Sequence, residues 1–408
     1  METQWIAGGV CAPKGFKANG IHCGVRKNAG KKDLALILAD HPCVAAAVYT
    51  RNKVCGAPVT VTRGHLSDGK AQACICNSGN ANTCNADGID IANAMCGALA
   101  KAVNISENDV IVASTGVIGQ PLPLKPIVTG IPALAAGLAP DESGARAAAE
   151  AIMTTDTRVK QIALTIDIDG TPVTIGAMCK GSGMIAPNMA TMLCFVTTDA
   201  DIDRDMLSDA LFAAVDKTFN RIVVDGDTST NDMTAIMASG MAGNRRVVSK
   251  GEAFDAFSGG LTAALAKLAR EVARDGEGAT TLITVNVAGA PDGSLARSIA
   301  RSVVTSPLVK TAIFGSDANV GRVLCAIGYT PGDFRADDIA LSIESDAGAL
   351  PVCEHSLTLP FPEETALAIL NRPEVIINID MNQGGSEATA WGCDLTYGYV
   401  HINGDYRS

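Results

Sequence analysis

The chain has 408 residues, of which 47% are hydrophobic and 18% are charged, and its formal net charge is −11. This length exceeds one ordinary domain, so we expect two domains or two packed halves. A nucleic-acid-binding protein needs a basic face, and the acidic balance without any Lys/Arg cluster argues against that class. No apolar run reaches the roughly 18 residues that a membrane span needs, and residues 1–5 lack the start of a signal peptide.

The thirteen cysteines are an odd number. Without a signal peptide, we expect reduced thiols in a cytoplasmic protein. Cys74, Cys76 and Cys84 lack the paired spacing of a zinc site, so we expect small buried core residues there and no bound metal.

Strands and helices alternate in the first part of the chain. Apolar runs and one-sided apolar patterns predict strands at 34–38, 43–49 and 73–76 and a helix at 88–103. A helix at 143–153 ends in a polar quartet at 154–157, which either caps the helix or lies at a site.

An apolar strand at 110–119 is interrupted by Ser114, Thr115 and Gly116. A strand that ends in Thr-Gly can present consecutive backbone N–H groups to one point. Preorganised donors of this kind are what an oxyanion requires. The alternative is an ordinary strand end.

Residues 160–168 and 171–178 predict a hairpin that turns at Asp169-Gly170. Its second strand leads to Lys180 and to residues 180–192, which read KGSGMIAPNMATM. This segment lacks the pattern of a phosphate loop and of a dinucleotide-binding loop. Thr191 opens an apolar run that reads as a buried strand. Its hydroxyl is either an ordinary strand side chain or a nucleophile aimed at the preceding peptide bond.

The second half of the sequence predicts long helices and a hydroxyl-rich acidic loop. Helices are expected at 203–218, 254–275 and 294–305, and a strand at 374–381. Ser294 is placed to cap the start of the last helix. Asp225, Asp227 and Asp232 lack the spacing and the closing Glu of an EF-hand, so we expect no metal there.

Residues 180–192 closely resemble the self-cleavage segment of the ornithine acetyltransferases, the glutamate N-acetyltransferases of arginine biosynthesis. The resemblance runs from about residue 7 to the C-terminus. Further matching segments are NSGNAN (77–82), DGDTSTND (225–232), DGEGAT (275–280) and INGDYRS (402–408). Residues 315–322 also match, except that Val320 replaces an aromatic residue.

The resemblance implies an α/β protein of layered sheets and helices, built from two packed halves with the site between them. It implies cleavage between Ala190 and Thr191 into an α chain (1–190) and a β chain (191–408), which assemble as an α2β2 heterotetramer. Thr191 would be the nucleophile, and Thr115 and Gly116 would form the oxyanion hole. The substrate-binding residues carried over from the family are Thr154, Lys180, Thr191, Glu277, Asn403 and Ser408.

The implied reaction is a ping-pong transfer of an acetyl group from N2-acetyl-ornithine to glutamate through an acetyl-Thr191 intermediate, without a metal or cofactor. Whether acetyl-CoA also serves as a co-substrate stays open. Two alternatives remain. One is a self-cleaving aminopeptidase with water as the acceptor, and the other is a non-catalytic small-molecule-binding protein that stays one chain.

Overall fold

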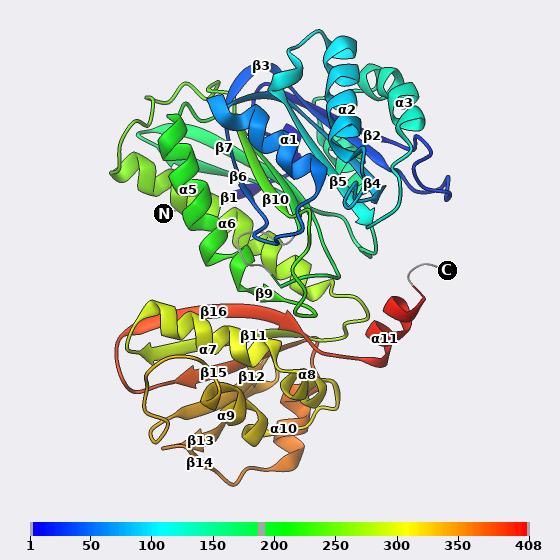
Figure 1. Cartoon of the computed structure of the whole chain (residues 1–408). Coiled ribbons are helices and arrows are strands. Elements are labelled where there is room, and N and C mark those ends of the chain that lie inside the picture. Colours follow the sequence, from blue (N-terminus) through cyan, green and yellow to red (C-terminus); the bar gives the residue numbers. More distant parts are fainter. Residues whose placement is uncertain (1–2, 187–191, 406–408) are drawn as a thin grey trace. The chain divides into compact units, whose positions relative to one another are not determined.

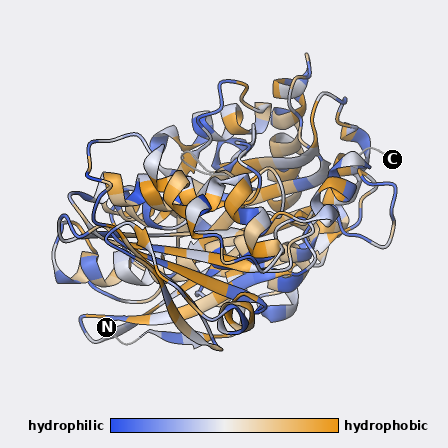
Figure 2. Cartoon of the chain, turned by 90° about the horizontal axis from the view of Figure 1, so that it is seen from below, coloured by the Kyte–Doolittle hydropathy of each residue, from blue (hydrophilic) through white to orange (hydrophobic). Residues whose placement is uncertain are grey.

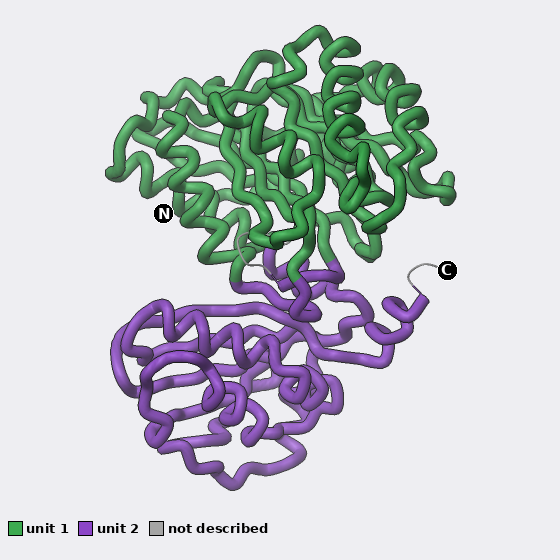
Figure 3. Tube along the Cα trace, in the orientation of Figure 1, with its two compact units in different colours: residues 1–181, 187–220, 228–268 green, residues 182–186, 221–227, 269–408 purple. Residues whose placement is uncertain are grey.

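The computed structural model describes residues 3–186 and 192–405. The chain divides into two compact units (Figures 1 and 3). Unit 1 comprises residues 1–181, 187–220 and 228–268, and unit 2 comprises residues 182–186, 221–227 and 269–408. Each unit has its own sheet, which confirms the predicted α/β class.

The sheet of unit 1 has nine strands in the order β1-β6-β7-β8-β10-β3-β4-β5, with β2 paired to β3. Its strands are β1 (Gln4–Ile6), β2 (Phe16–Ile21), β3 (Leu34–Tyr49), β4 (Lys70–Asn80), β5 (Val110–Val117), β6 (Lys160–Ile168), β7 (Thr171–Lys180), β8 (Leu193–Thr198) and β10 (Met233–Ala238). Strands β8 and β10 follow residue 191 in the chain, and they lie between β7 and β3, which precede it. The middle of this sheet is therefore built from both sides of the expected cleavage point.

Helices cover both faces of the sheet in unit 1. They are α1 (Ala57–His65), α2 (Gly88–Val103), α3 (Leu124–Ala136), α4 (Glu142–Ile152), α5 (Arg204–Lys217) and the first part of α6 (Glu252–Arg274). Alternate residues of β3 to β5 pack into two separate cores, one with α4 and the other with α2 and α3. In Figure 2 the strands carry much of the hydrophobic colour, as this two-sided burial requires.

Several local predictions are confirmed in unit 1. Helix α2 has the predicted bounds. The hairpin of β6 and β7 turns at Asp169 and Gly170, whose φ angles of +53° and +81° suit a two-residue hairpin turn. The two short strands expected at 34–38 and 43–49 form one strand, β3, whose pairing with β4 shifts register between Leu38 and Cys43.

Unit 2 contains a seven-stranded sheet in the order β14-β13-β12-β15-β11-β16-β9. Its strands are β9 (Ile222–Val223), β11 (Leu282–Ala290), β12 (Ala340–Ser345), β13 (Gly348–Glu354), β14 (Leu357–Thr358), β15 (Glu374–Asp380) and β16 (Ser386–Cys393). The helices after α6 are α7 (Gly293–Thr305), α8 (Pro307–Phe314), α9 (Val320–Gly328), α10 (Glu363–Leu370) and α11 (Tyr397–Gly404). Helices α7 to α10 pack with the sheet around one core.

Two residue-level predictions are wrong. Helix α7 is capped by Asp292, whose carboxylate accepts the backbone N–H groups of Ser294 and Leu295, so Ser294 is a capped residue and not the cap. Cys74 and Cys76 are buried as expected, but Cys84 is exposed. Cys84 lies after the end of β4 and has a positive φ angle of +61°.

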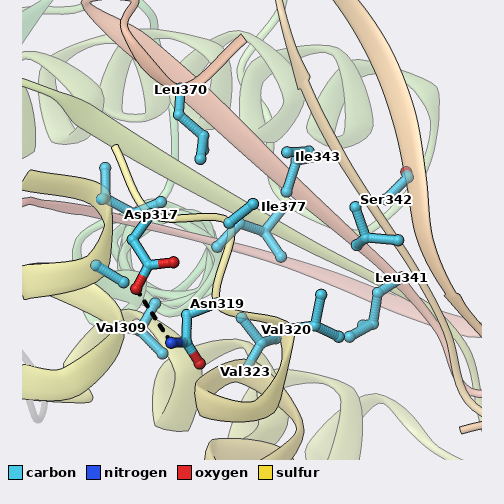
Figure 4. A pocket seen from close by; sticks show the side chains of 14 residues that line it. Val309, Asp317, Asn319, Val320, Val323, Leu341, Ser342, Ile343, Leu370 and Ile377 are labelled. Atoms are coloured by element: carbon cyan, nitrogen blue, oxygen red, sulfur yellow. Dashed lines mark hydrogen bonds between the residues drawn. The ribbon is translucent and has the colours of Figure 1, made fainter. Parts of the chain in front are cut away.

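The core of unit 2 encloses a cavity of about 30 Å3 (Figure 4). Val320, at the start of α9, lines it together with residues of α8, β12 and β15. Val320 is the residue that stands where the resembling family has an aromatic side chain.

Among the described helices, which include the 23-residue α6, none is long and apolar enough to cross a membrane.

Candidate functional site

Thr115 and Gly116 lie near the end of β5, in unit 1. Gly116 has a φ angle of +132°, and a Cβ atom built there would lie 2.3 Å from the carbonyl carbon of Gly79. Real Cβ atoms do not approach backbone this closely, so the contact between the ends of β4 and β5 requires glycine at this position. Close packing of the two strand ends therefore restricts position 116 to glycine.

Strand β5 ends the sheet, so every second residue directs its backbone groups away from β4. The Thr62 hydroxyl occupies this edge at Val112, where it donates to the carbonyl oxygen (2.7 Å) and accepts from the N–H (2.9 Å). The pairing of β4 with β5 becomes irregular at the next residues, where Asn80 lies opposite both Thr115 and Val117. The prediction that Thr115 and Gly116 form an oxyanion hole stays a prediction.

Lys180 is the last residue of β7, and it is 8% exposed. Its ammonium group donates to the hydroxyl oxygen of Thr115 across 3.4 Å. Because a lysine ammonium can only donate, the hydrogen of the Thr115 hydroxyl stays available for another acceptor. Two residues predicted separately are thus brought together in unit 1.

Asp156 is a buried carboxylate that binds groups on both sides of the hairpin β6–β7. Its carboxylate accepts the N–H of Thr154 (2.9 Å), the N–H of Gly181 (2.7 Å) and the ammonium of Lys160 (2.7 Å). Burial alone would raise the pKa of Asp156, but the charges of Lys160 and Lys180 and these hydrogen bonds lower it below its ordinary value. One carboxylate therefore fixes the backbone at Thr154 and immediately after Lys180.

Asn231 joins three segments through hydrogen bonds. It lies in the family-like segment DGDTSTND, but no role was predicted for this residue itself. Its amide nitrogen donates to the carbonyl oxygens of Ala81 (2.5 Å) and Ser114 (3.0 Å). Its amide oxygen accepts the hydroxyls of Thr83 and Thr230, each at 2.6 Å. Asn231 therefore holds the edge of β5 just before Thr115.

Asp232 is fully buried next to Asn231, and its Oδ2 atom has no hydrogen-bond partner in the described part of the chain. Burial raises the pKa of Asp232 well above its ordinary value, although Ser229 and the charge of Lys180 act in the opposite direction. A carboxyl group of this kind is common at functional sites.

Glu277 and Asn403 meet in unit 2. The Glu277 carboxylate accepts the side-chain N–H of Asn403 at 2.8 Å, and its backbone N–H donates to the carbonyl of Ser182 at 2.8 Å. Glu277 is 8% exposed, so it is not a free surface side chain. Gly183 packs directly on its carboxyl group, since a Cβ there would lie 2.3 Å from the carboxyl carbon.

Ala190, Thr191 and Ser408 lie outside the described residues. The residue that follows Thr191 is described: the carbonyl of Met192 accepts the N–H of Met233 at 2.9 Å, which fixes the entry to β8 beside β10. Across residues 3–186 and 192–405, no three His, Cys, Asp or Glu side chains gather as a metal site would require.

Comparisons with known proteins agree on one family. A family model described as the ArgJ family matches residues 17–408. The chain is 51% identical over 407 residues to the arginine biosynthesis bifunctional protein ArgJ of Symbiobacterium thermophilum, a match that covers 99% of this chain and 100% of the relative. It is 46% identical over 404 residues to the protein of that name from Caldanaerobacter subterraneus subsp. tengcongensis, with 99% of each chain covered.

Solved structures also resemble the chain. The bifunctional protein argJ from Bacillus halodurans is 46% identical, with a TM-score of 0.49, and the match covers 52% of this chain and 97% of that chain. An ornithine acetyltransferase from Mycobacterium tuberculosis, solved in complex with ornithine, is 40% identical with a TM-score of 0.43. That match covers 46% of this chain and 100% of the other.

Proposed function

The chain belongs to the ArgJ family, and from that premise we propose that it transfers an acetyl group from N2-acetyl-ornithine to glutamate in arginine biosynthesis. The observation that carries the proposal is the family match across residues 17–408, which includes the segment 180–192. The hydrogen bond between Lys180 and Thr115 in unit 1 supports this proposal, because it brings together two residues that the family resemblance assigns to the site.

The first step is self-cleavage. The Thr191 hydroxyl oxygen attacks the carbonyl carbon of Ala190, the C–N bond breaks, and the proton passes to the new α-amine. Water then hydrolyses the ester, which leaves a carboxylate on Ala190 and a free hydroxyl on Thr191. A free α-amine has a pKa of about 8, so it can act as a base beside its own hydroxyl.

The second step is acetyl transfer. The Thr191 hydroxyl attacks the acetyl carbonyl of N2-acetyl-ornithine, ornithine leaves with the proton, and the acetyl group stays on Thr191. The amine of glutamate then attacks this ester and regenerates the hydroxyl. Thr115 and Gly116 would stabilise the oxyanion in each half, and the loss of one such donor typically raises the barrier by about 3 kcal/mol.

The remaining family residues would hold the substrate. Lys180 supplies a cation in an acidic protein, and its ammonium would bind a carboxylate of the amino-acid substrate. Glu277 would pair with the substrate's ammonium group, and Asn403 would orient Glu277 through the hydrogen bond between them. Thr154 and Ser408 would contribute the other polar contacts.

The relatives are named bifunctional, and this supports a second reaction in which acetyl-CoA acetylates glutamate by way of the same Thr191 ester. The product chains would assemble as an α2β2 heterotetramer in the cytoplasm. No disulfide joins the thirteen cysteines, all of which lie in the described part of the chain, and this supports a reducing compartment.

The test is the intact mass of the purified protein under denaturing conditions, measured for the wild type and for Thr191→Ala. We expect two fragments split between Ala190 and Thr191, and an uncut variant. Incubation of the cleaved protein with N2-acetyl-ornithine should leave the 191–408 fragment one acetyl group heavier, and glutamate should remove that group. A wild-type chain that stays whole would refute the mechanism.

A further inference from the structure

Asp225, which follows β9 in unit 2, binds the backbone of the segment that leads to the expected cleavage point. Its Oδ2 atom accepts the N–H of Met184 at 2.6 Å, and its Oδ1 atom accepts the N–H of Ile185 at 2.9 Å. Oδ1 also accepts the N–H of Asp227 at 3.2 Å. The Tyr399 hydroxyl also faces this carboxylate. In the described part of the chain, no lysine or arginine forms an ion pair with Asp225, so three backbone N–H groups are the main partners of its charge.

The bound segment has an unfavourable backbone conformation. Met184 has a φ angle of +55°, in the left-handed region that side chains other than glycine rarely adopt. Such a residue costs about 1–2 kcal/mol. A hydrogen bond to a charged acceptor contributes about 1.5–3 kcal/mol, so the two bonds from Met184 and Ile185 to Asp225 are large enough to hold the turn.

The neighbouring bonds fix the same segment within unit 2. The carbonyl of Ile185 accepts the N–H of Val224 at 2.7 Å, directly beside Asp225 in sequence. The carbonyl of Ser182 accepts the N–H of Glu277 at 2.8 Å. Of these bonds to residues 182–185, only those to Asp225 use a side chain. A substitution at Asp225 therefore removes these bonds and keeps the donor and acceptor groups of the backbone bonds to Val224 and Glu277.

Burial raises the pKa of Asp225, and the N–H groups of Asp227, Ile185 and Met184 act against that rise. The carboxylate and the turn thus stabilise each other: the turn supplies donors to the charge, and the charge holds the turn. No role in acetyl transfer has been given to Asp225.

We propose that Asp225 is a positioning residue for self-cleavage, which it promotes by holding Met184 and Ile185 in the turn from which the chain continues to the Ala190–Thr191 bond. The inference rests on the self-cleavage proposed above. Attack of a hydroxyl on its own preceding carbonyl depends on close alignment, and a misplacement of about 1 Å can cost on the order of 100-fold in rate.

The experiment follows the appearance of the 191–408 fragment by mass after synthesis of the full chain in a cell-free system. The variants are Asp225→Asn, which keeps one acceptor oxygen, and Asp225→Ala, which keeps none. We expect half-times longer than wild type by about tenfold for Asn and about 100-fold for Ala. If the cleavage rate depends on the acceptor oxygens of residue 225, it should fall in two steps, from Asp to Asn and from Asn to Ala.

Asp227→Asn is the matched control, because Asp227 is exposed and contributes its backbone N–H, which the substitution keeps. Melting temperatures of all variants, measured in the uncut Thr191→Ala background, must lie well above the assay temperature. Wild-type cleavage rates in both Asp225 variants would overturn the inference, as would equal slowing by Asp227→Asn. An uncut wild type would instead refute the proposed function.

Discussion

At the scale of single residues, the Asp156 carboxylate joins three backbone and side-chain donors in a buried place. Its pKa lies below the ordinary value of 3.8, so this carboxylate stabilises the fold above that pH. The stabilisation is lost as the pH falls through the folded-state pKa. The ammonium of Lys160, which is 2% exposed, pairs with this carboxylate at 2.7 Å.

We therefore expect Asp156→Asn to destabilise the fold by about 3–5 kcal/mol near pH 7, because it removes one charge of a buried ion pair. Urea unfolding in the Thr191→Ala background would measure this loss at several pH values. The difference from the parent should begin to shrink as the pH falls below the ordinary pKa of 3.8, because the unfolded chain then takes up the proton. It should go on shrinking until the pH reaches the lower folded-state pKa of Asp156. Asp167→Asn, at an exposed turn, is the control, and a difference that does not change with pH would contradict the assignment.

Gly116 allows a second test at this scale. Gly116→Ala would force a Cβ into the backbone of Gly79, so we expect lost stability and little or no self-cleavage. Gly119→Ala is the matched control, because Gly119 also has a positive φ, of +77°, but a Cβ there meets nothing within 4 Å. Mass analysis and thermal melting of both variants would separate a collision from backbone strain. Equal behaviour of the two variants would exclude the collision.

The residues that sequence reasoning identified were those with a family motif, such as Lys180 and Glu277. Their partners were not predictable in the same way. Asn231 and Asp156 act through donors and acceptors far away in the sequence, and a polar residue in a loop gives no sign of which backbone groups it will meet. The pairing of Glu277 with Asn403 likewise spans 126 residues.

At the scale of elements, the segments with strong local patterns were predicted well. Helix α2 depends on apolar residues spaced along one face, and the β6–β7 hairpin depends on its turn residues. Both patterns can be recognised in the sequence alone. The unification of β3 was not predictable, because Asp40 and Pro42 between the two expected strands indicate a turn, whereas the chain continues there as one strand with a shift in its pairing with β4. Helix α11 was missed because its residues follow no buried stripe.

The start of α7 provides a test of the corrected cap. Asp292→Ala should destabilise the fold by about 1 kcal/mol, because two N–H groups lose their acceptor. Ser294→Ala should change stability by less than about 0.5 kcal/mol, since the Ser294 side chain is exposed and does not cap the helix. Chemical denaturation of both variants measures the comparison, and a larger loss for Ser294→Ala would restore the original assignment.

At the scale of the whole molecule, compact units and the expected product chains are two different divisions of the sequence. The unit boundary falls within α6, between residues 268 and 269, whereas the cleavage point is expected at 190–191. The length of the chain could predict two halves, but it could not predict that β8 and β10 complete the sheet of unit 1. That arrangement depends on pairing between strands far apart in the chain.

The interleaved sheet predicts that the cleaved chains stay together. Strands β8 and β10 pair with β7 on one side and β3 on the other, and these outer strands belong to the other product. We expect native mass spectrometry or gel filtration to show both fragments in one particle, and denaturing conditions to separate them. Release of either fragment without denaturant would contradict the strand order.

The same strand order changes the molecularity of unfolding. In an uncut chain, each molecule unfolds to one polypeptide. After cleavage, loss of the shared sheet frees two independent polypeptides per molecule, so dilution favours the unfolded side more strongly. The melting temperature of the cut protein should therefore fall more steeply on dilution than that of its uncut Thr191→Ala counterpart.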